Sequence, residues 1–312
     1  MSMNLLDLAM LAQQDSNSFK NFLEVLVVGL GNGAVYAMLG LGLVVIYRST
    51  GLLNFAQGEL AMFSAFLVWT IWNAGMPMTL AILGGMVGGF LIGAIVHKVA
   101  VSPLGDSHER PLAVVIVTIG LFLALNGGAQ VIWGTVDKRL DPWFGVGQVT
   151  IGGIAISWQK IGSFAVLAVI VLLLWMLFNF TKIGLGMRAV ASNSESAALS
   201  GVPVQRILML GWGLAAAVGT MAGVFSAPNL GLGTNLMQLI LVFGFAAIAL
   251  GGFDSILGAV IGGFLVGILS AVVPQYVSFF EKMPLAPAFI LILAILLFRP
   301  EGLFGSKEVQ RV

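Results

Sequence analysis

The fold is decided by the stretch FLEVLVVGLGNGAVYAMLGLGLVVIY, residues 22–47, in which Glu24 is the one charged residue. A transmembrane helix needs about 20 consecutive, mostly apolar residues. Further apolar runs follow along the chain, separated by breaks that contain charged residues or proline. These runs cover residues 60–72, 78–96, 111–133, 161–180, 207–226, 236–250, 256–273 and 285–298. The pattern predicts an all-α, polytopic integral membrane protein with about 8–9 transmembrane helices.

Composition excludes a soluble protein of this length. The chain is 59% hydrophobic and 9% charged, with a mean hydropathy of +1.05, whereas soluble domains carry roughly 25% charged residues. We therefore expect residues 1–312 to form one transmembrane domain covered mainly by membrane lipid. The net charge of +1 indicates no nucleic-acid partner. Residues 1–20 lack the basic start of a signal peptide, and we expect an N-terminal tail or a short interfacial helix.

Three of the apolar runs, 60–72, 236–250 and 285–298, are too short to cross a bilayer alone. Short hydrophobic segments interrupted by glycine are typical of broken or re-entrant helices around a translocation path. The chain contains 41 glycines, many spaced four residues apart, which lets helices pack closely in lipid. We expect these pairs to mediate packing within the chain, with a subunit interface as the alternative. The pairs are Gly29 and Gly33, Gly85 and Gly89, Gly89 and Gly93, Gly219 and Gly223, and Gly258 and Gly262.

Basic residues predict the orientation, because lysine and arginine accumulate in cytoplasmic loops. Nine alternating spans with the N-terminus outside place nine basic residues inside and five outside. The inner set is Arg48, Lys98, Arg110, Lys182, Arg188, Arg206, Arg299, Lys307 and Arg311, and the outer set is Lys20, Lys138, Arg139, Lys160 and Lys282.

The residues needed for catalysis or metal binding are scarce. The chain has no cysteine and two histidines, and it lacks both the GxxxxGK[ST] nucleotide-binding loop and the GxSxG nucleophile elbow. We therefore expect no catalytic residue, no metal site and no cofactor. Active transport by such a chain would need either a separate ATPase or an ion gradient.

Polar residues cluster between the first two apolar runs, in STGLLNFAQGE, residues 49–59. Asn54, Gln57 and Glu59 lie here in an otherwise apolar stretch. Polar groups at membrane depth are tolerated only where protein or a water-filled cavity satisfies them. The segment is either a broken helix that lines a cavity or a tight cytoplasmic turn with a capped helix start.

The loop at residues 181–206 predicts a short helix between two spans. Ser192 and Glu195 have the spacing of a capping box, Gly201 supplies a helix stop, and Pro203 can open the next helix. Isolated helices this short are marginal in water. The helix therefore needs a surface to pack on, either the membrane or a partner protein.

Five stretches together resemble the permease subunit of branched-chain amino acid ABC importers. They are GNGAVYAMLGLGLVVIYRSTGLLNFAQGE from Gly31, VTIGLFLALN from Val117, IGLGMRAVASNSESAALSGVPVQRI from Ile183, AIALGGFDSILGAVIGGFLVGI from Ala247, and LFRPEGLFG from Leu297. The sequence departs from the family pattern at Gln57, where histidine is frequent, and at Asp254, where glycine is common. These departures leave the substrate open, because related permeases carry urea or short amides.

The resemblance implies a division of labour. The chain would be no enzyme but would form half of a translocation pathway in a bacterial plasma (inner) membrane. Its partners would be a homologous second permease, two cytoplasmic ABC ATPase subunits and an extracytoplasmic substrate-binding protein. The translocation-path candidates are Asn54, Gln57, Glu59, Thr118 and Asn126. The ATPase-coupling candidates, in the cytoplasmic coupling loop 181–206, are Arg188, Asn193, Glu195, Ala197, Leu199 and Gly201.

Alternatives from other classes stay open. A urea or short-chain amide permease would share the same architecture. An ion-coupled secondary carrier would transport without an ATPase, and a membrane-embedded enzyme acting on lipid would need paired ionisable residues, which are scarce here.

Overall fold

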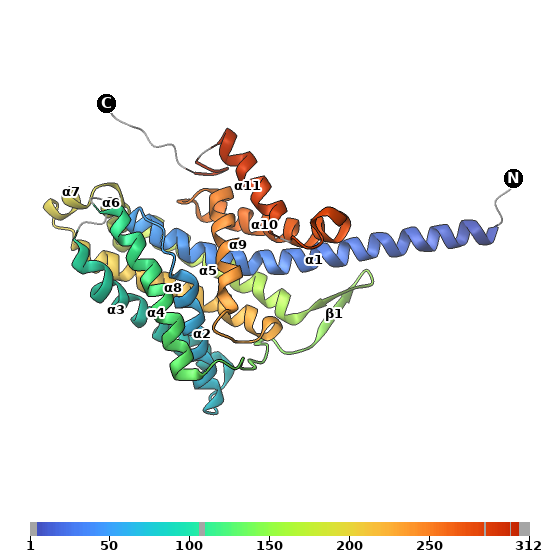
Figure 1. The fold of residues 1–312 in the computed structure, drawn as a ribbon, viewed down its shortest axis with the longest axis horizontal. Helices are drawn as coiled ribbons and strands as arrows, with labels where there is room; N and C mark the ends of the chain where they lie inside the picture. Colours follow the sequence, from blue (N-terminus) through green and yellow to red (C-terminus); the bar gives the residue numbers. More distant parts are fainter. Residues whose placement is uncertain (1–4, 106–109, 284, 300, 306–312) are drawn as a thin grey trace.

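The computed structural model describes residues 5–105, 110–283, 285–299 and 301–305 (Figure 1). The chain is mainly helical. The helices are α1 (Leu5–Thr50), α2 (Gln57–Asn73), α3 (Met78–Val96), α4 (Pro111–Trp133), α5 (Trp158–Phe180), α6 (Lys182–Ser192), α7 (Ser194–Leu199), α8 (Val204–Leu230), α9 (Leu236–Gly251), α10 (Ile256–Tyr276) and α11 (Ala286–Phe298). A π-helical turn, His97–Val101, and a 3-10 turn, Ser102–Leu104, extend α3, and a second 3-10 turn covers Ser278–Phe280.

Each apolar run predicted from the sequence corresponds to a helix in the structure, so the polytopic all-α fold is confirmed. Six helical segments of the described chain are long and apolar enough to cross a membrane, and α9 and α11 are shorter apolar helices. Helix α2 has 17 residues. The helix of the first span starts at Leu5, and residues 1–4 lie outside the described part of the chain.

The bundle has two distinguishable ends (Figure 1). One carries α6 and α7, and we call it the α6–α7 end. The other carries strands β1 (Gln148–Ile151) and β2 (Ile154–Ser157), and we call it the hairpin end. The N-terminal part of α1 projects from the bundle on the hairpin side.

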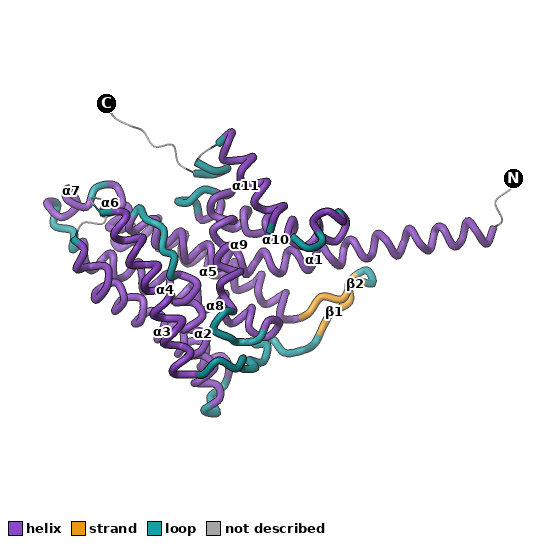
Figure 2. The backbone as a smooth tube through the Cα atoms, viewed as in Figure 1, coloured by secondary structure: helices purple, strands orange, loops and turns teal. Residues whose placement is uncertain are grey.

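The hairpin was not predicted from the sequence. Its strands pair antiparallel, from Gln148 opposite Ser157 to Ile151 opposite Ile154, and Figure 2 shows them beside the helices. Gly152 and Gly153 turn the chain with φ angles of 58° and 82°, as two-residue hairpin turns require. Helix α5 begins directly after β2, capped by the Ser157 hydroxyl, which accepts a hydrogen bond from the Lys160 N–H. The hairpin therefore sets where α5 starts.

Glycines bring α1 and α10 into backbone contact. A Cβ atom on Gly33 would lie 2.8 Å from the carbonyl oxygen of Gly263, and one on Gly29 would lie 2.9 Å from that of Gly267. Two glycine pairs spaced four residues apart thus face each other, which gives the closest helix approach that small residues permit. The same helices contribute many core residues, including Ala34, Ala37, Ala259 and Val266.

The other glycine pairs predicted from the sequence pack within the chain as well. On α8, Cβ atoms at Gly219 and Gly223 would lie 3.1 and 2.7 Å from the Cβ atoms of Ala61 and Ala65 on α2. On α3, Gly89 and Gly93 face α2 and α8, and on α10, Gly258 and Gly262 face α9. The intramolecular reading of these pairs is confirmed.

This packing predicts opposite effects for two Gly→Ala substitutions. A Gly263→Ala side chain would lie 2.8 Å from both the backbone nitrogen and the Cβ of Ala37, so we expect a loss of about 1–3 kcal/mol from overpacking. Gly127 on α4 has no atom within 4 Å of the added carbon. Gly127→Ala should therefore be neutral or raise stability, by up to about 1 kcal/mol. Thermal unfolding of the purified protein in detergent measures both, and equal midpoints would contradict the packing role.

Candidate functional site

The turn between α1 and α2 is held by local hydrogen bonds. The Thr50 hydroxyl donates to the Ile46 carbonyl over 2.9 Å and accepts from the Leu52 N–H over 3.1 Å. The Asn54 side-chain oxygen accepts from the Ala56 N–H over 2.9 Å, just before α2 begins. Asn54 is 1% exposed. The segment is thus a tight turn held by side-chain hydrogen bonds, in which Asn54 and Ala56 are buried, and no side chain in the described part of the chain caps the start of α2.

Gln57 fastens α2 to its neighbours. Its side-chain amide nitrogen donates to the Ala215 carbonyl on α8 over 2.8 Å. Gly42 on α1 and Gly219 on α8 leave room for this amide, because an added Cβ on either would lie within 3 Å of the Gln57 nitrogen. Through this hydrogen bond Gln57 holds α2 in position against α8. The polar groups at the break are therefore satisfied in part by protein, whereas the Asn54 amide nitrogen and the Gln57 side-chain oxygen are buried without a hydrogen-bond partner among the described residues.

Glu59 belongs to a polar network that joins α2, α4 and the segment before α9. The Asn126 amide donates to the Glu59 carboxylate over 3.2 Å and to the Thr234 carbonyl over 2.8 Å. Gln130 donates to the Asn126 oxygen over 2.7 Å. Glu59 is 1% exposed. Two of the five path candidates, Glu59 and Asn126, are thus in direct contact.

Thr118 stands apart from this network. Its hydroxyl donates within α4 to the Val115 carbonyl over 2.8 Å, and the residue is fully buried. Back-bonding of this kind satisfies a hydroxyl in an apolar environment. The structure therefore places Thr118 in the core without joining it to Glu59 or Asn126 by a hydrogen bond.

The two helices that follow irregular segments, α2 and α9, meet near the network. A Cβ on Gly58 would lie 3.1 Å from the Leu241 Cβ and 3.3 Å from the Met237 carbonyl. The rings of Phe55 and Phe245 pack 5.2 Å apart. Interrupted helices that meet inside a membrane bundle are typical of transport sites.

Two cavities open at the hairpin end. The inner cavity, of about 220 Å³, lies between α1, α5, α8 and α9. The outer cavity, of about 540 Å³, lies beside the hairpin. Ser157, Gln159 and Asn229 line both, so the two spaces adjoin. Together they lead from the surface into the bundle as far as Tyr36 and Phe243.

Sequence reasoning missed the polar lining of the inner cavity. Asn32 and Tyr36 are four residues apart on α1, and Ser226 and Asn229 are three apart on α8. Each pair therefore lies on one helix face. Polar residues at helical spacing within an apolar span were the available signal.

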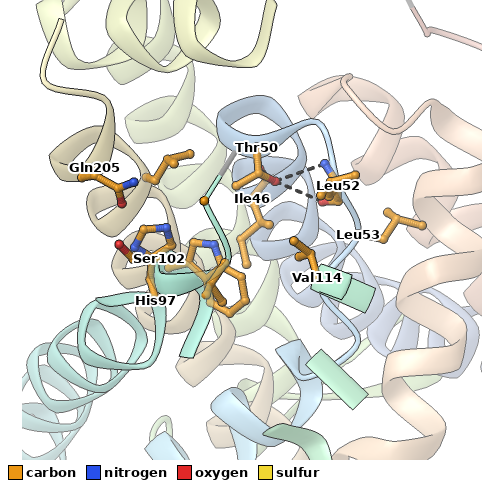
Figure 3. A pocket seen from close by; sticks show the side chains of 12 residues that line it. Ile46, Thr50, Leu52, Leu53, His97, Ser102, Val114 and Gln205 are labelled. Atoms are coloured by element: carbon orange, nitrogen blue, oxygen red, sulfur yellow. Dashed lines mark hydrogen bonds between the residues drawn. The ribbon is translucent and has the colours of Figure 1, made fainter. Parts of the chain in front are cut away.

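A third cavity, at the α6–α7 end, is far smaller. Figure 3 shows it between Thr50, His97, Ser102 and Gln205. Its volume is about 10 Å³. That space suits about one water molecule.

Helices α6 and α7 follow each other at the α6–α7 end (Figure 1), and α6 packs on the bundle through Gly184, Gly186, Met187 and Val190. The predicted short helix is present as α7, and Gly201 follows it with a φ of 82°. The predicted capping box is wrong. Ser192 is the last residue of α6, and the Asn193 side chain caps α7 by accepting from the Ser196 N–H over 2.7 Å. An asparagine is as good a cap as serine, and Ser192 belongs to α6, a helix that was not predicted from the sequence.

The coupling candidates form an exposed surface on a buried support. Arg188, Asn193, Glu195, Leu199 and Gly201 are exposed, and Leu199 retains 85% of its free surface. Ala197, at 5% exposure, faces the protein.

Arg48, near the end of α1, contacts two other elements at the α6–α7 end. Its guanidinium donates to the Asp254 carbonyl over 2.5 Å and lies 4.8 Å from the centre of the Phe178 ring. It thereby ties the end of α1 to α5 and to the α9–α10 connection.

Comparison with known proteins matches residues 25–298 to the family described as the permease component of branched-chain amino acid transport systems. The high-affinity branched-chain amino acid permease LivH of Escherichia coli is 29% identical over 95% of this chain and 100% of its own length. The permease BraD of Pseudomonas aeruginosa is 28% identical over 94% and 98%. The ribose import permease RbsC of Escherichia coli is 22% identical over 76% and 74%. The family match covers all the predicted spans except the first residues of one. The chain therefore belongs to the family of branched-chain amino acid transport system permease components.

Proposed function

We propose that this protein is the membrane-spanning permease subunit of an ATP-driven importer of branched-chain amino acids. The family match over residues 25–298 carries the proposal. The relatives that align over nearly their whole length are named as branched-chain amino acid permeases. The ribose permease aligns less completely and at lower identity, which favours an amino acid over a sugar.

Permease components of ABC importers work with ATPase and binding-protein partners. For this chain we propose a homologous second permease, two cytoplasmic ATPase subunits and an extracytoplasmic binding protein, assembled in a bacterial plasma membrane. The absence of a nucleotide-binding loop from the sequence supports a separate ATPase. The α6–α7 surface is proposed to dock on it, and the hairpin end to receive the binding protein.

The Glu59–Asn126 network is proposed to border the translocation path. A buried carboxylate in a membrane bundle is costly and marks a functional position by default. The observation that supports this role is the meeting of the interrupted helices α2 and α9 beside it. Gln57 and Asn54, by contrast, act through the packing of α2.

The reconstituted complex tests the function. Proteoliposomes that contain both permeases and the ATPases, supplied with the binding protein, should accumulate L-leucine only when ATP is present. Uptake by this chain alone, driven by an ion gradient, would instead support a secondary carrier. Accumulation of urea or acetamide in place of leucine would support the amide permease.

Two substitutions test the docking surface. Arg188→Ala or Leu199→Ser should lower transport-coupled ATP hydrolysis by about tenfold, as loss of an exposed interface anchor does. Lys20→Ala is the control, because Lys20 is also exposed but lies on α1, pairs with Glu24 and lines neither cavity. Membrane insertion should be normal in all three. Wild-type coupling in both test variants would contradict the placement of the docking surface.

Cysteine labelling tests the orientation, since the chain has no cysteine of its own. A membrane-impermeant thiol reagent applied to intact cells should label an Arg139→Cys variant. It should label a Glu195→Cys variant only after the cells are permeabilised. Labelling of the second variant in intact cells would place α7 outside and overturn the proposed coupling.

A further inference from the structure

The inner cavity carries a cation without a counter-charge. Lys160 lines it, and the side-chain carbons of Lys160 lie over Gly31, where an added Cβ would be 3.2 Å from the Lys160 Cγ. Among the described residues no carboxylate lies within 4.0 Å of the Lys160 ammonium, and no acidic residue lines the inner cavity. A lysine held beside a cavity without an anionic partner is suited to an anionic ligand.

A second donor at the same place is also unused. The Gln159 side chain is 8% exposed, and its oxygen accepts from the Phe144 N–H over 3.2 Å. Its amide nitrogen is buried and has no hydrogen-bond partner among the described residues. Buried polar groups without a partner are uncommon and call for an explanation. Because Gln159 lines both cavities, a ligand that enters this space can supply the missing acceptor.

The backbone adds to the same polarity. Gln159 and Lys160 are the second and third residues of α5, a helix of 23 residues. The N-terminus of a helix carries a partial positive charge and favours anions. A lysine, an amide donor and a helix N-terminus therefore converge on one wall of the cavity.

The opposite walls have a different chemistry. Tyr36 and Phe243 stack with ring centres 4.5 Å apart, and Phe225 also lines the space. Asn32, Ser226 and Asn229 add neutral oxygens, which accept hydrogen bonds from an ammonium group. The cavity thus combines a cationic wall, neutral acceptors and an aromatic wall.

We propose that the inner cavity binds the substrate on its way from the hairpin end, with Lys160 and the Gln159 amide holding the carboxylate. The aromatic wall receives the branched side chain, and the neutral oxygens receive the ammonium group. This inference rests on the proposed import of amino acids and deepens it. It assigns the cavity to a carboxylate-bearing substrate and not to urea, an amide or a sugar, which have no carboxylate for Lys160 to pair with.

The outer cavity, through which the inner cavity is reached, has no net charge in its lining. Its charged lining is Asp137, Lys138, Arg139 and Asp141, two acids and two bases. Arg139 pairs with Asp141 over 3.2 Å, and Lys138 lies 5.6 Å from the centre of the Trp69 ring. Selection for a carboxylate therefore belongs to the inner cavity.

Charge-selective labelling tests the site without relying on transport. In an Asn229→Cys variant of the assembled complex, an anionic methanethiosulfonate should react faster than a cationic one. Adding Lys160→Met should lower the ratio of the two rates by about tenfold, the loss of one favourable charge interaction. Lys160→Arg should preserve the ratio. Lys20→Met is the control, because Lys20 lies 3.9 Å from Glu24 on α1 and does not line the cavity. An unchanged ratio in the Lys160→Met variant would overturn the proposal.

Ligand protection identifies the group that is bound. L-Leucine and 4-methylpentanoate, which both carry a carboxylate, should slow the labelling of the Asn229→Cys variant, and 4-methylpentanamide should not. Equal protection by the amide, or none by the two carboxylates, would exclude carboxylate binding here.

Uptake by the same variants separates the two proposals. Lys160→Met should reduce leucine uptake by about tenfold, as expected for loss of a charge-assisted hydrogen bond. Lys160→Arg, which keeps the charge, should lose less uptake than Lys160→Met, and Lys20→Met should transport normally. Wild-type uptake by the Lys160→Met variant would contradict the proposed substrate site in the inner cavity and would leave the proposed import function standing. Absence of leucine uptake by the wild-type complex would overturn the proposed function, and the labelling ratio would still decide whether the cavity selects anions.

Discussion

Close backbone packing between glycine-bearing helices is the constraint on which this structure depends. In lipid no hydrophobic effect drives helices together, so association relies on van der Waals contact and on hydrogen bonds. The facing glycine pairs of α1 and α10 supply such contact, and the alanines of α2 against the glycines of α8 supply it again. Long helices bound in this way form a rigid frame. Shorter elements, which lack the length to cross the membrane unaided, are then held by the frame.

The frame explains how the breaks in the bundle are tolerated. Backbone groups that leave a helix inside a membrane need partners from the protein. At the α1–α2 break, Thr50 and Asn54 provide them locally, and Gln57 anchors the new helix to α8. Before α9, the Thr234 carbonyl receives the Asn126 amide. The same polar side chains that make the breaks possible also bring a carboxylate, Glu59, into the protein interior. Asn126 therefore has both roles: it satisfies the backbone before α9 and contacts Glu59 in the candidate transport site.

Hydropathy and helix-end chemistry allowed most of the fold to be predicted from the sequence. The apolar runs located the spans, and Gly201 correctly marked the end of α7. The hairpin at residues 148–157 was missed, although its central Gly152–Gly153 is a turn signal, because strands of four residues leave only a weak pattern in the sequence. The cap of α7 was placed on Ser192 because serine and asparagine compete for the same role and the sequence does not say where α6 stops.

The candidate site was harder to predict, because it depends on contacts between distant segments. The pairing of Glu59 with Asn126 joins residues 67 positions apart, and no local pattern announces it. The inner cavity draws on four helices, and its lysine stands at the start of α5, where a sequence pattern suggests only an orientation signal. A cavity forms where packed helices diverge from one another, and neither glycine spacing nor hydropathy predicts where that happens.

The course of α1 indicates how the two ends of the protein can communicate. Asn32 and Tyr36 on this helix line the inner cavity, and Arg48 near its end binds the α9–α10 connection and packs on α5. Beside the cavity-lining residues, at Gly29 and Gly33, α1 packs against α10 so closely that an added Cβ would meet the α10 backbone. Packed interfaces of this kind move between discrete arrangements and do not deform gradually. A displacement at the α6–α7 end that reaches α1 would therefore move α1 and α10 together, and with them the wall of the inner cavity that α1 supplies.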